Sequence, residues 1–158
     1  MKGGFMTLTP CDFDPGLVAD DPRVARYTLA QQVFPFAPAS VRDAREMVRQ
    51  ALSEHGQHCL VGMALQVVSE LVTNSIVHGI GAEFTLTVKR LGFRTVYIDV
   101  AGRSEGRPTL RSNDLSAEGG RGLLLVDLLA QRWGWRMDED DGLLHTWCLL
   151  DGSQALAA

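Results

Sequence analysis

Cysteine is scarce in this sequence, and so are long apolar runs; each shortage excludes a class of protein. The three cysteines, Cys11, Cys59 and Cys148, lie far apart, and no Cys-x-x-Cys pair occurs. Neither a disulfide framework nor a zinc site is therefore expected. The longest apolar runs, such as residues 123–126, are far shorter than the roughly 20 residues that a bilayer span needs. The N-terminus carries no apolar signal segment, so we expect a cytoplasmic protein that does not associate with membranes.

Positive charge is also in short supply. Lysine and arginine number 15 against 19 aspartates and glutamates, which leaves a formal net charge of −4. A protein whose main partner is nucleic acid needs a basic footprint, so direct nucleic-acid binding is not expected. The length of 158 residues and the hydrophobic share of 46% suit one domain with an ordinary core.

Local composition divides the chain into an arm, one domain and a tail. Residues 1–26 carry Gly, Pro and Asp without periodicity and are expected to form a loose arm. Residues 27–151 form the domain, and residues 152–158 are expected to fray. The elements predicted within the domain are an edge strand over 27–36, a helix from Ser40 to Gly56, a longer helix over 57–78, a hairpin of strands 84–89 and 95–101, a surface loop over 102–120, a helix over 122–130, and strands over 133–136 and 144–150.

Single residues supply the start and stop signals of these elements. Pro35 limits the first strand to the edge of a sheet, because proline cannot donate to a ladder. Ser40 is in position to cap the first helix, and Asp43 then stands in its first turn, where a carboxylate suits the helix dipole. Gly56 and Gly79 end the two helices.

The longer helix carries a polar stripe. Glu70, Asn74 and His78 follow one another at helical spacing and share one side of the helix. The opposite side holds the apolar residues Leu65, Val68, Val72 and Ile76. A carboxylate, a carboxamide and an imidazole in register would serve a hard metal ion and a proton transfer. A solvated surface is an equal alternative on spacing alone, although asparagine is a poor helix former.

A glycine-rich turn precedes the third helix. Glu118-Gly119-Gly120-Arg121-Gly122 stands directly before Leu123. Glycines let the backbone approach a ligand closely, and the free N–H groups at a helix start attract phosphate. A plain helix-entry loop explains the same residues equally well.

Taken together, these segments resemble a known family. Glu70-Leu71-x-Thr73-Asn74-x-x-x-His78 is similar to the N-box of the GHKL (Bergerat-fold) ATPase superfamily, and 68–74 resembles its branch of actinobacterial anti-sigma factor serine/threonine kinases. Glu118 to Asp127, with Trp133-Gly134 behind it, resembles the glycine box and following helix of that branch. Thr146-Trp147 resembles its terminal Thr-Val-Trp segment, without the middle valine. The resemblance spans roughly residues 27–150 in the right order.

The resemblance implies a fold, an activity and partners. The fold would be α/β, of the α+β sandwich type, with a mixed, mainly antiparallel sheet and helices packed on one face. The activity would be that of an ATP-binding anti-sigma factor that phosphorylates an anti-anti-sigma (STAS-domain) protein and so regulates transcription. ATP and Mg²⁺ would be the cofactors, and a sigma factor the second protein partner. Such kinases are often homodimers.

The resemblance also assigns residues. Glu70 would be the general base that activates a hydroxyl, and Asn74 would be the Mg²⁺ ligand. The nucleotide would lie among Asn74, His78, Gly102, Ser104, Gly119, Gly120, Arg121, Gly122, Leu123 and Thr146. For His78 a structural role at the helix end is an equal alternative, and Thr146 is nearly as easily read as an ordinary strand residue.

The sequence departs from the family at one position. Family members carry an aspartate after the second strand of the hairpin, where it binds the adenine amino group. The alternation of Val96, Ile98 and Val100 places Gly102 there, and it directs Asp99 to the opposite face. Losing that charge-assisted hydrogen bond would cost about 1.5–3 kcal/mol. Two functions therefore stay open: the kinase, and a non-catalytic protein-binding regulator with a degenerate nucleotide site.

Overall fold

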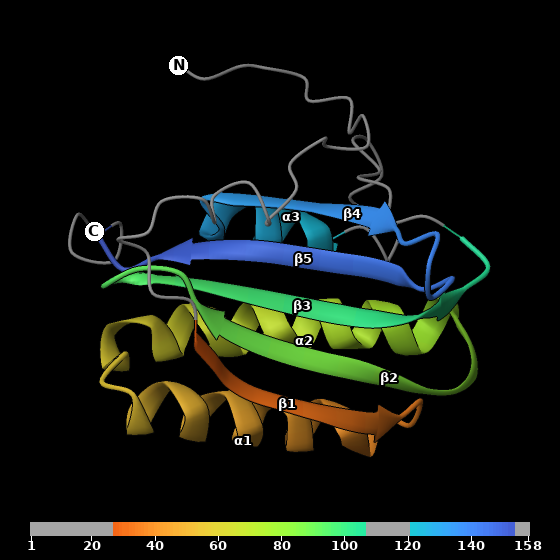
Figure 1. The fold of residues 1–158 in the computed structure, drawn as a ribbon, viewed down its shortest axis with the longest axis horizontal. Helices are drawn as coiled ribbons and strands as arrows, with labels where there is room; N and C mark the ends of the chain where they lie inside the picture. Colours follow the sequence, from red (N-terminus) through yellow and green to blue (C-terminus); the bar gives the residue numbers. More distant parts are fainter. Residues whose placement is uncertain (1–26, 107–120, 154–158) are drawn as a thin grey trace.

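The computed structural model describes residues 27–106 and 121–153, and these ranges form an α+β sandwich (Figure 1). Its elements in chain order are β1 Tyr27–Pro35, α1 Ala39–Glu54, a 3-10 turn His58–Leu60, α2 Val61–His78, β2 Gly79–Arg90, β3 Thr95–Ser104, α3 Arg121–Leu129, β4 Arg132–Met137 and β5 Leu144–Asp151. The predicted arm, most of the predicted surface loop and residues 154–158 lie outside the described residues.

The five strands form one sheet in the order β1-β2-β3-β5-β4. Every described pairing is antiparallel, so the expected mixed, mainly antiparallel sheet is antiparallel throughout this part of the chain. β1 lies at the edge, as Pro35 predicts, and the predicted hairpin is β2 paired with β3. β3 extends to Ser104, three residues beyond its predicted end, and therefore includes Gly102.

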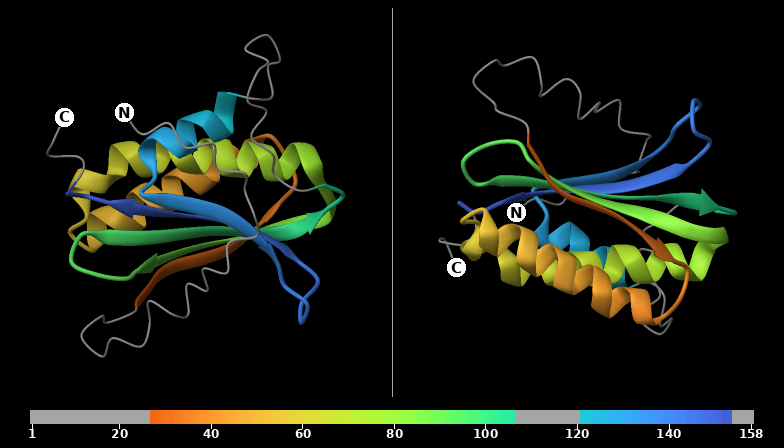
Figure 2. Two further views of the ribbon diagram at one scale, coloured as in Figure 1. Left: turned by 90° about the horizontal axis from the view of Figure 1, so that it is seen from above. Right: turned by 60° about the horizontal axis from the view of Figure 1, so that its bottom comes forward.

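All three helices cover the same face of the sheet (Figure 2). Val96, Ile98 and Val100 of β3 point toward them and are buried, as the alternation of that strand predicts. On α2, Val68 and Val72 are fully buried in the same core. The helix packs between α1 and α3 and against the sheet, which explains why it is apolar over much of its surface.

The residues His58–His78 have the length and the mean hydropathy, 1.5, of a membrane-spanning helix, although the lengths of the apolar runs predict no such segment. A buried central helix passes the same test, because core burial selects the same side chains as a bilayer. Six residues of α2 are buried within this fold: Ala64, Leu65, Val67, Val68, Leu71 and Val72.

The predicted cap of the first helix is wrong. α1 begins at Ala39, with Pro38 in the cap position and no side-chain cap hydrogen bond. Ser40 lies inside the first turn, where its buried hydroxyl donates to the Pro35 carbonyl oxygen at 2.7 Å. Asp43 is exposed, and the first turn of α1 carries no acidic residue. Only a short bend separates β1 from α1, so the Ser40 hydroxyl can reach the end of the strand. Its hydrogen bond to Pro35 links the helix to β1.

Candidate functional site

A small pocket opens where the C-terminal end of α2 meets β3 and β5. It is lined by Phe36, Asn74, Ser75, His78, Gly102, Arg103, Ser104, Gly106, Leu144 and Thr146. Its cavity volume is about 20 Å³, which holds a water molecule but not a nucleoside. A larger ligand therefore requires side chains to move.

Five residues that the sequence singles out share this pocket: Asn74, His78, Gly102, Ser104 and Thr146. They come from α2, β3 and β5, and the sheet register explains their meeting. Val100 pairs with Thr146, and Gly102 pairs with Leu144, so the ends of β3 and β5 lie side by side beneath the end of α2.

The end of α2 is tied to β3 by its backbone. The His78 carbonyl oxygen accepts hydrogen bonds from the Ser104 hydroxyl at 3.2 Å and from the Glu105 N–H at 3.3 Å. The Ser104 hydroxyl also lies 2.8 Å from the Gly106 carbonyl oxygen, so its single proton is shared between these two acceptors. Ser104 thus helps to place the helix end, and the exposed His78 side chain remains on the pocket wall.

Glu70 lies outside the pocket. Its carboxylate is directed at the first turn of α3, and a side chain added at Gly122 would collide with the Glu70 Oε2 atom. Glu70 and Asn74 are one helical turn apart on α2, but they face different neighbours, because α3 packs beside α2 at Glu70 whereas β3 and β5 lie near Asn74. Within the described part of the chain, Asn74 lines this pocket and Glu70 does not.

The glycine turn is described only in part. Gly119 and Gly120 lie outside the described residues, and Arg121 begins α3. Gly122 allows the close contact with Glu70, and Leu123 is buried in the core. Farther along this segment the Trp133 indole N–H donates to the Asp127 carboxylate at 2.9 Å, which links α3 to β4.

An aromatic ring occupies the space where the family's aspartate was expected. A Cβ atom at Gly102 would lie 3.0 Å from Phe36 Cζ and 3.1 Å from Phe84 Cβ. A Cβ atom at Gly79 would lie 2.6 Å from the same Phe36 ring and would also collide with the Ser75 carbonyl oxygen. Sequence reasoning placed Phe36 only at the end of the edge strand, and no local pattern links it to Gly102.

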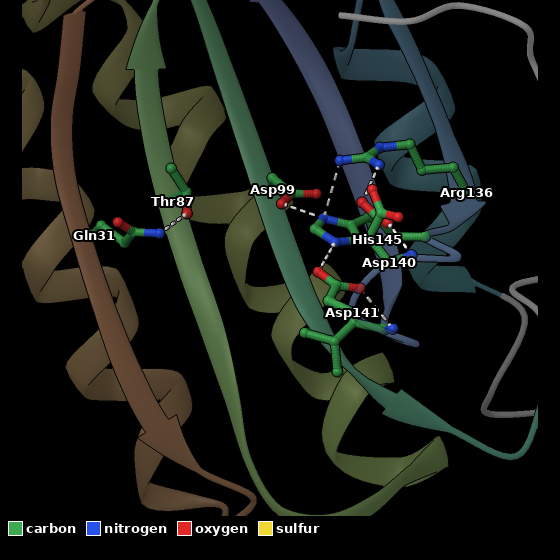
Figure 3. Close-up of polar contacts among 9 residues, drawn as sticks. Gln31, Thr87, Asp99, Arg136, Asp140, Asp141 and His145 are labelled. Atoms are coloured by element: carbon green, nitrogen blue, oxygen red, sulfur yellow. Dashed lines mark hydrogen bonds and ion pairs between the residues drawn. The ribbon is translucent and has the colours of Figure 1, made fainter.

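A second polar cluster lies on the face of the sheet that the helices leave uncovered (Figure 3). His145 Nδ1 hydrogen-bonds the Asp99 carboxylate at 2.8 Å, and His145 Nε2 hydrogen-bonds Asp141 at 3.2 Å. Arg136 pairs with Asp138 at 2.9 Å and approaches His145 Nδ1 at 3.5 Å. Asp99 therefore faces away from the pocket, as the strand alternation predicts.

Burial and charge shift the pKa values of this cluster. Burial and the charge of Arg136 lower the pKa of His145, but the hydrogen bond and charge of Asp99 and the hydrogen bond of Asp141 outweigh them, so the net pKa is raised. Burial raises the pKa of Tyr97, and the charge of Asp99 raises it further. Two buried polar atoms of this cluster, Asp99 Oδ1 and Arg136 Nε, have no hydrogen-bond partner among the described residues.

The cluster borders a groove with a cavity volume of about 480 Å³, a size typical of small-molecule sites. The side chains of Asp138, Asp141 and His145 also lie close enough to share a metal ion. Their oxygen and nitrogen atoms already bond Arg136 and one another, so an ion would have to displace those bonds. No sequence motif predicts this cluster, because its members are brought together by the pairing of β3, β5 and β4.

No protein-family model matches this chain, and no curated protein matches it. A functional assignment therefore depends on the residues of the site and on their resemblance to the family motifs.

Proposed function

We propose that this chain is an ATP-binding anti-sigma factor of the GHKL type, with serine/threonine kinase activity on an anti-anti-sigma (STAS-domain) protein. The observation that carries the proposal is the shared pocket of Asn74, His78, Gly102, Ser104 and Thr146. The resemblance assigned these residues from three separate segments, and the fold brings α2, β3 and β5 together at this pocket; of the five, Gly102 stands where the family carries an aspartate. The proposal places the protein in the cytoplasm, with a sigma factor as its second partner.

Asn74 is the residue that would hold Mg²⁺. Its carboxamide lines the pocket and makes no hydrogen bond to another described side chain or backbone group, so its oxygen is available. Mg²⁺ prefers oxygen ligands and commonly combines one or two protein ligands with phosphates and water. When bound, the metal would neutralise the charge of the nucleotide phosphates.

The proposed reaction transfers the γ-phosphoryl group of ATP to a serine or threonine of the partner. The hydroxyl oxygen forms a bond to the γ-phosphorus, and the bond from that phosphorus to the β–γ bridging oxygen breaks, which releases ADP. The hydroxyl proton would pass to the Glu70 carboxylate. Glu70 now packs against Gly122, so this role requires the side chain to leave that contact.

Nucleotide binding by the full chain tests the proposal. We expect Mg-ADP to bind in isothermal titration calorimetry, and Asn74→Ala to weaken binding at least tenfold through loss of the metal ligand. Gln66→Ala is the matched control, because Gln66 is exposed on the same helix and is not part of the pocket. Failure of Mg-ADP to bind at millimolar concentration would defeat the proposed nucleotide site.

Phosphotransfer tests the kinase activity separately. The chain is incubated with γ-labelled ATP, Mg²⁺ and a purified STAS-domain antagonist. We expect label on the antagonist, and we expect Glu70→Ala to abolish it while Mg-ADP binding persists. Phosphotransfer that is unchanged in Glu70→Ala would overturn the role of Glu70.

The second candidate is a non-catalytic protein-binding regulator that keeps the fold without using a nucleotide. The ring of Phe36 over Gly102 and the small volume of the pocket favour it. Mg-ADP binding distinguishes the two candidates. The regulator would bind its protein partner but not Mg-ADP, whereas the kinase would bind its protein partner and Mg-ADP.

A further inference from the structure

The groove of about 480 Å³ on the sheet face opposite the helices takes no part in the proposed kinase reaction. Its walls come from all five strands and from the turn between β4 and β5. Its volume lies in the range of small-molecule sites, and most of its lining side chains are polar. A small hydrophilic ligand therefore suits this groove better than an apolar one.

Lys89 brings an unpaired positive charge to the groove. The residue is half-buried on β2, and its side chain lines the groove. Within the described part of the chain, its ammonium group makes no ion pair and no hydrogen bond. A carboxylate is a natural partner for such a group, because charge-assisted hydrogen bonds are stronger than neutral ones.

Asp99 brings an incompletely paired negative charge. The residue is 7% exposed and borders the groove from β3. One carboxylate oxygen is held by His145 Nδ1 at 2.8 Å, whereas the other, Oδ1, has no partner among the described residues. A buried acceptor without a donor is costly, so a ligand that supplies a donor gains from this atom. The last torsion of an aspartate side chain is soft, so a small rotation presents Oδ1 to the groove.

The other charged groups around the groove are paired with one another. Arg136 pairs with Asp138 at 2.9 Å, and His145 Nε2 pairs with Asp141 at 3.2 Å. The raised pKa of His145 favours its charged form. These four groups then carry no net charge, and the two groups that remain have opposite signs.

We propose that this groove binds a small zwitterion of the amino-acid class, with its carboxylate on Lys89 and its ammonium group on Asp99. A ligand with a single charge would leave one of these two groups unpaired. This groove and the pocket at the end of α2 lie on opposite faces of the sheet, so binding here does not depend on the proposed kinase activity.

The register of the sheet supports the size of the ligand. Lys89 pairs with Tyr97, and Asp99 stands two residues farther along β3, so Lys89 and Asp99 are diagonal neighbours on one face. Such neighbours lie about 7–8 Å apart. A charge-assisted hydrogen bond is about 2.7–2.9 Å long, so a ligand with one carbon between its charged groups reaches both residues with one bond at each end.

Thermal unfolding of the full chain is the first test. Each standard L-amino acid is added at about 10 mM, or at its solubility limit where that is lower. We expect at least one of them to raise Tm by about 3 °C or more, the shift that a ligand produces at about ten times its dissociation constant. If no amino acid raises Tm, the inference is overturned.

Blocked derivatives of the amino acid that binds form the second test, measured by isothermal titration calorimetry. The N-acetyl derivative lacks the ammonium charge, and the amide lacks the carboxylate. We expect both to bind at least about tenfold more weakly than the free amino acid, because each loses one charge-assisted hydrogen bond. A derivative that binds as tightly as the free amino acid would refute the two-point recognition.

Substitutions then assign the two contacts. Lys89→Met removes the ammonium group and keeps a long side chain, so we expect it to weaken the free amino acid about tenfold and leave the amide unchanged. Asp99→Asn should weaken the free amino acid similarly and leave the N-acetyl derivative unchanged. Arg42→Met is the control, because Arg42 is exposed on α1 and is not part of the groove. Unchanged binding of the free amino acid in Lys89→Met would overturn the inference, and this variant decides it even if Asp99→Asn does not fold.

Discussion

His145 of β5 and Asp99 of β3 are joined by a buried hydrogen bond of 2.8 Å on the face of the sheet opposite the helices. Asp99 pairs with Trp147, and Ala101 pairs with His145, so the two side chains are diagonal neighbours on one face. Asp141, in the turn between β4 and β5, bonds the other ring nitrogen. The imidazole thus lies between two carboxylates, with Arg136 of β4 close by.

This arrangement predicts that stability depends on pH through His145. The pKa of His145 in the folded protein is raised above its ordinary value of 6.5. The protonated ring therefore contributes stability that is complete below about pH 6.5 and is lost as the pH rises through the folded pKa. We expect His145→Gln to lower the free energy of unfolding by about 1.5–3 kcal/mol at pH 6, with a smaller effect at pH 8.5.

Urea denaturation of both proteins at several pH values between those two measures the effect. His58→Gln, which alters an exposed histidine of the 3-10 turn, is the control. A difference between wild type and His145→Gln that stays constant or grows with pH would contradict the proposed ion pairing.

Gly102 and Phe36 should be energetically coupled. Gly102→Ala places a methyl group 3.0 Å from Phe36 Cζ and 3.1 Å from Phe84 Cβ, so we expect a loss of about 1–3 kcal/mol from overpacking. In a Phe36→Ala background the same substitution should cost less, because one of the two obstructing groups is gone. A double-mutant cycle measured by chemical denaturation gives the coupling energy. Additive effects would show that the ring does not press on position 102.

Glu70 and Gly122 form a second coupled pair. Gly122→Ala drives a methyl group into the Glu70 carboxylate, and the flexible side chain must then turn away. We expect a loss of about 0.5–2 kcal/mol in the wild type and no loss, or a small gain from helix propensity, in a Glu70→Ala background. Thermal unfolding of the four proteins of this cycle is the measurement. An equal loss of stability in both backgrounds would show that the substitution acts through the backbone of α3 and not through the contact with Glu70.

Gly62 offers a substitution that should stabilise the protein. It lies in the first turn of α2, where a Cβ atom would meet nothing within 4 Å. Alanine there reduces the backbone entropy of the unfolded chain and favours the helix, so Gly62→Ala should add about 0.4–1 kcal/mol. Gly56→Ala is the matched contrast: it also meets open space, but its φ of +71° disfavours any side chain, and it should destabilise. A loss of stability in Gly62→Ala would show that the glycine is required there.

Part of the candidate site could be predicted because it depends on local periodicity. The spacing of Asn74 and His78 places both on the pocket side of α2, and the alternation of β3 separates Gly102 from Asp99. Helical and strand periods act over a few residues, so they can be read without knowing the rest of the fold. The predicted cap of α1 is wrong, because the Ser40 hydroxyl bonds the Pro35 carbonyl oxygen at the end of β1 and not the backbone of the helix.

The amino-acid sequence alone determined the order of the elements, the buried faces of α2 and β3, and the edge position of β1, since each follows from the side-chain pattern of a single segment. The tertiary structure decided that Phe36 lies on Gly102, that Glu70 faces Gly122 and that Asp99 bonds His145. These pairs are distant along the chain, and their contacts depend on sheet register and helix packing. The contacts of residues close in sequence are limited by backbone geometry, whereas those of distant residues are settled only when the whole core packs.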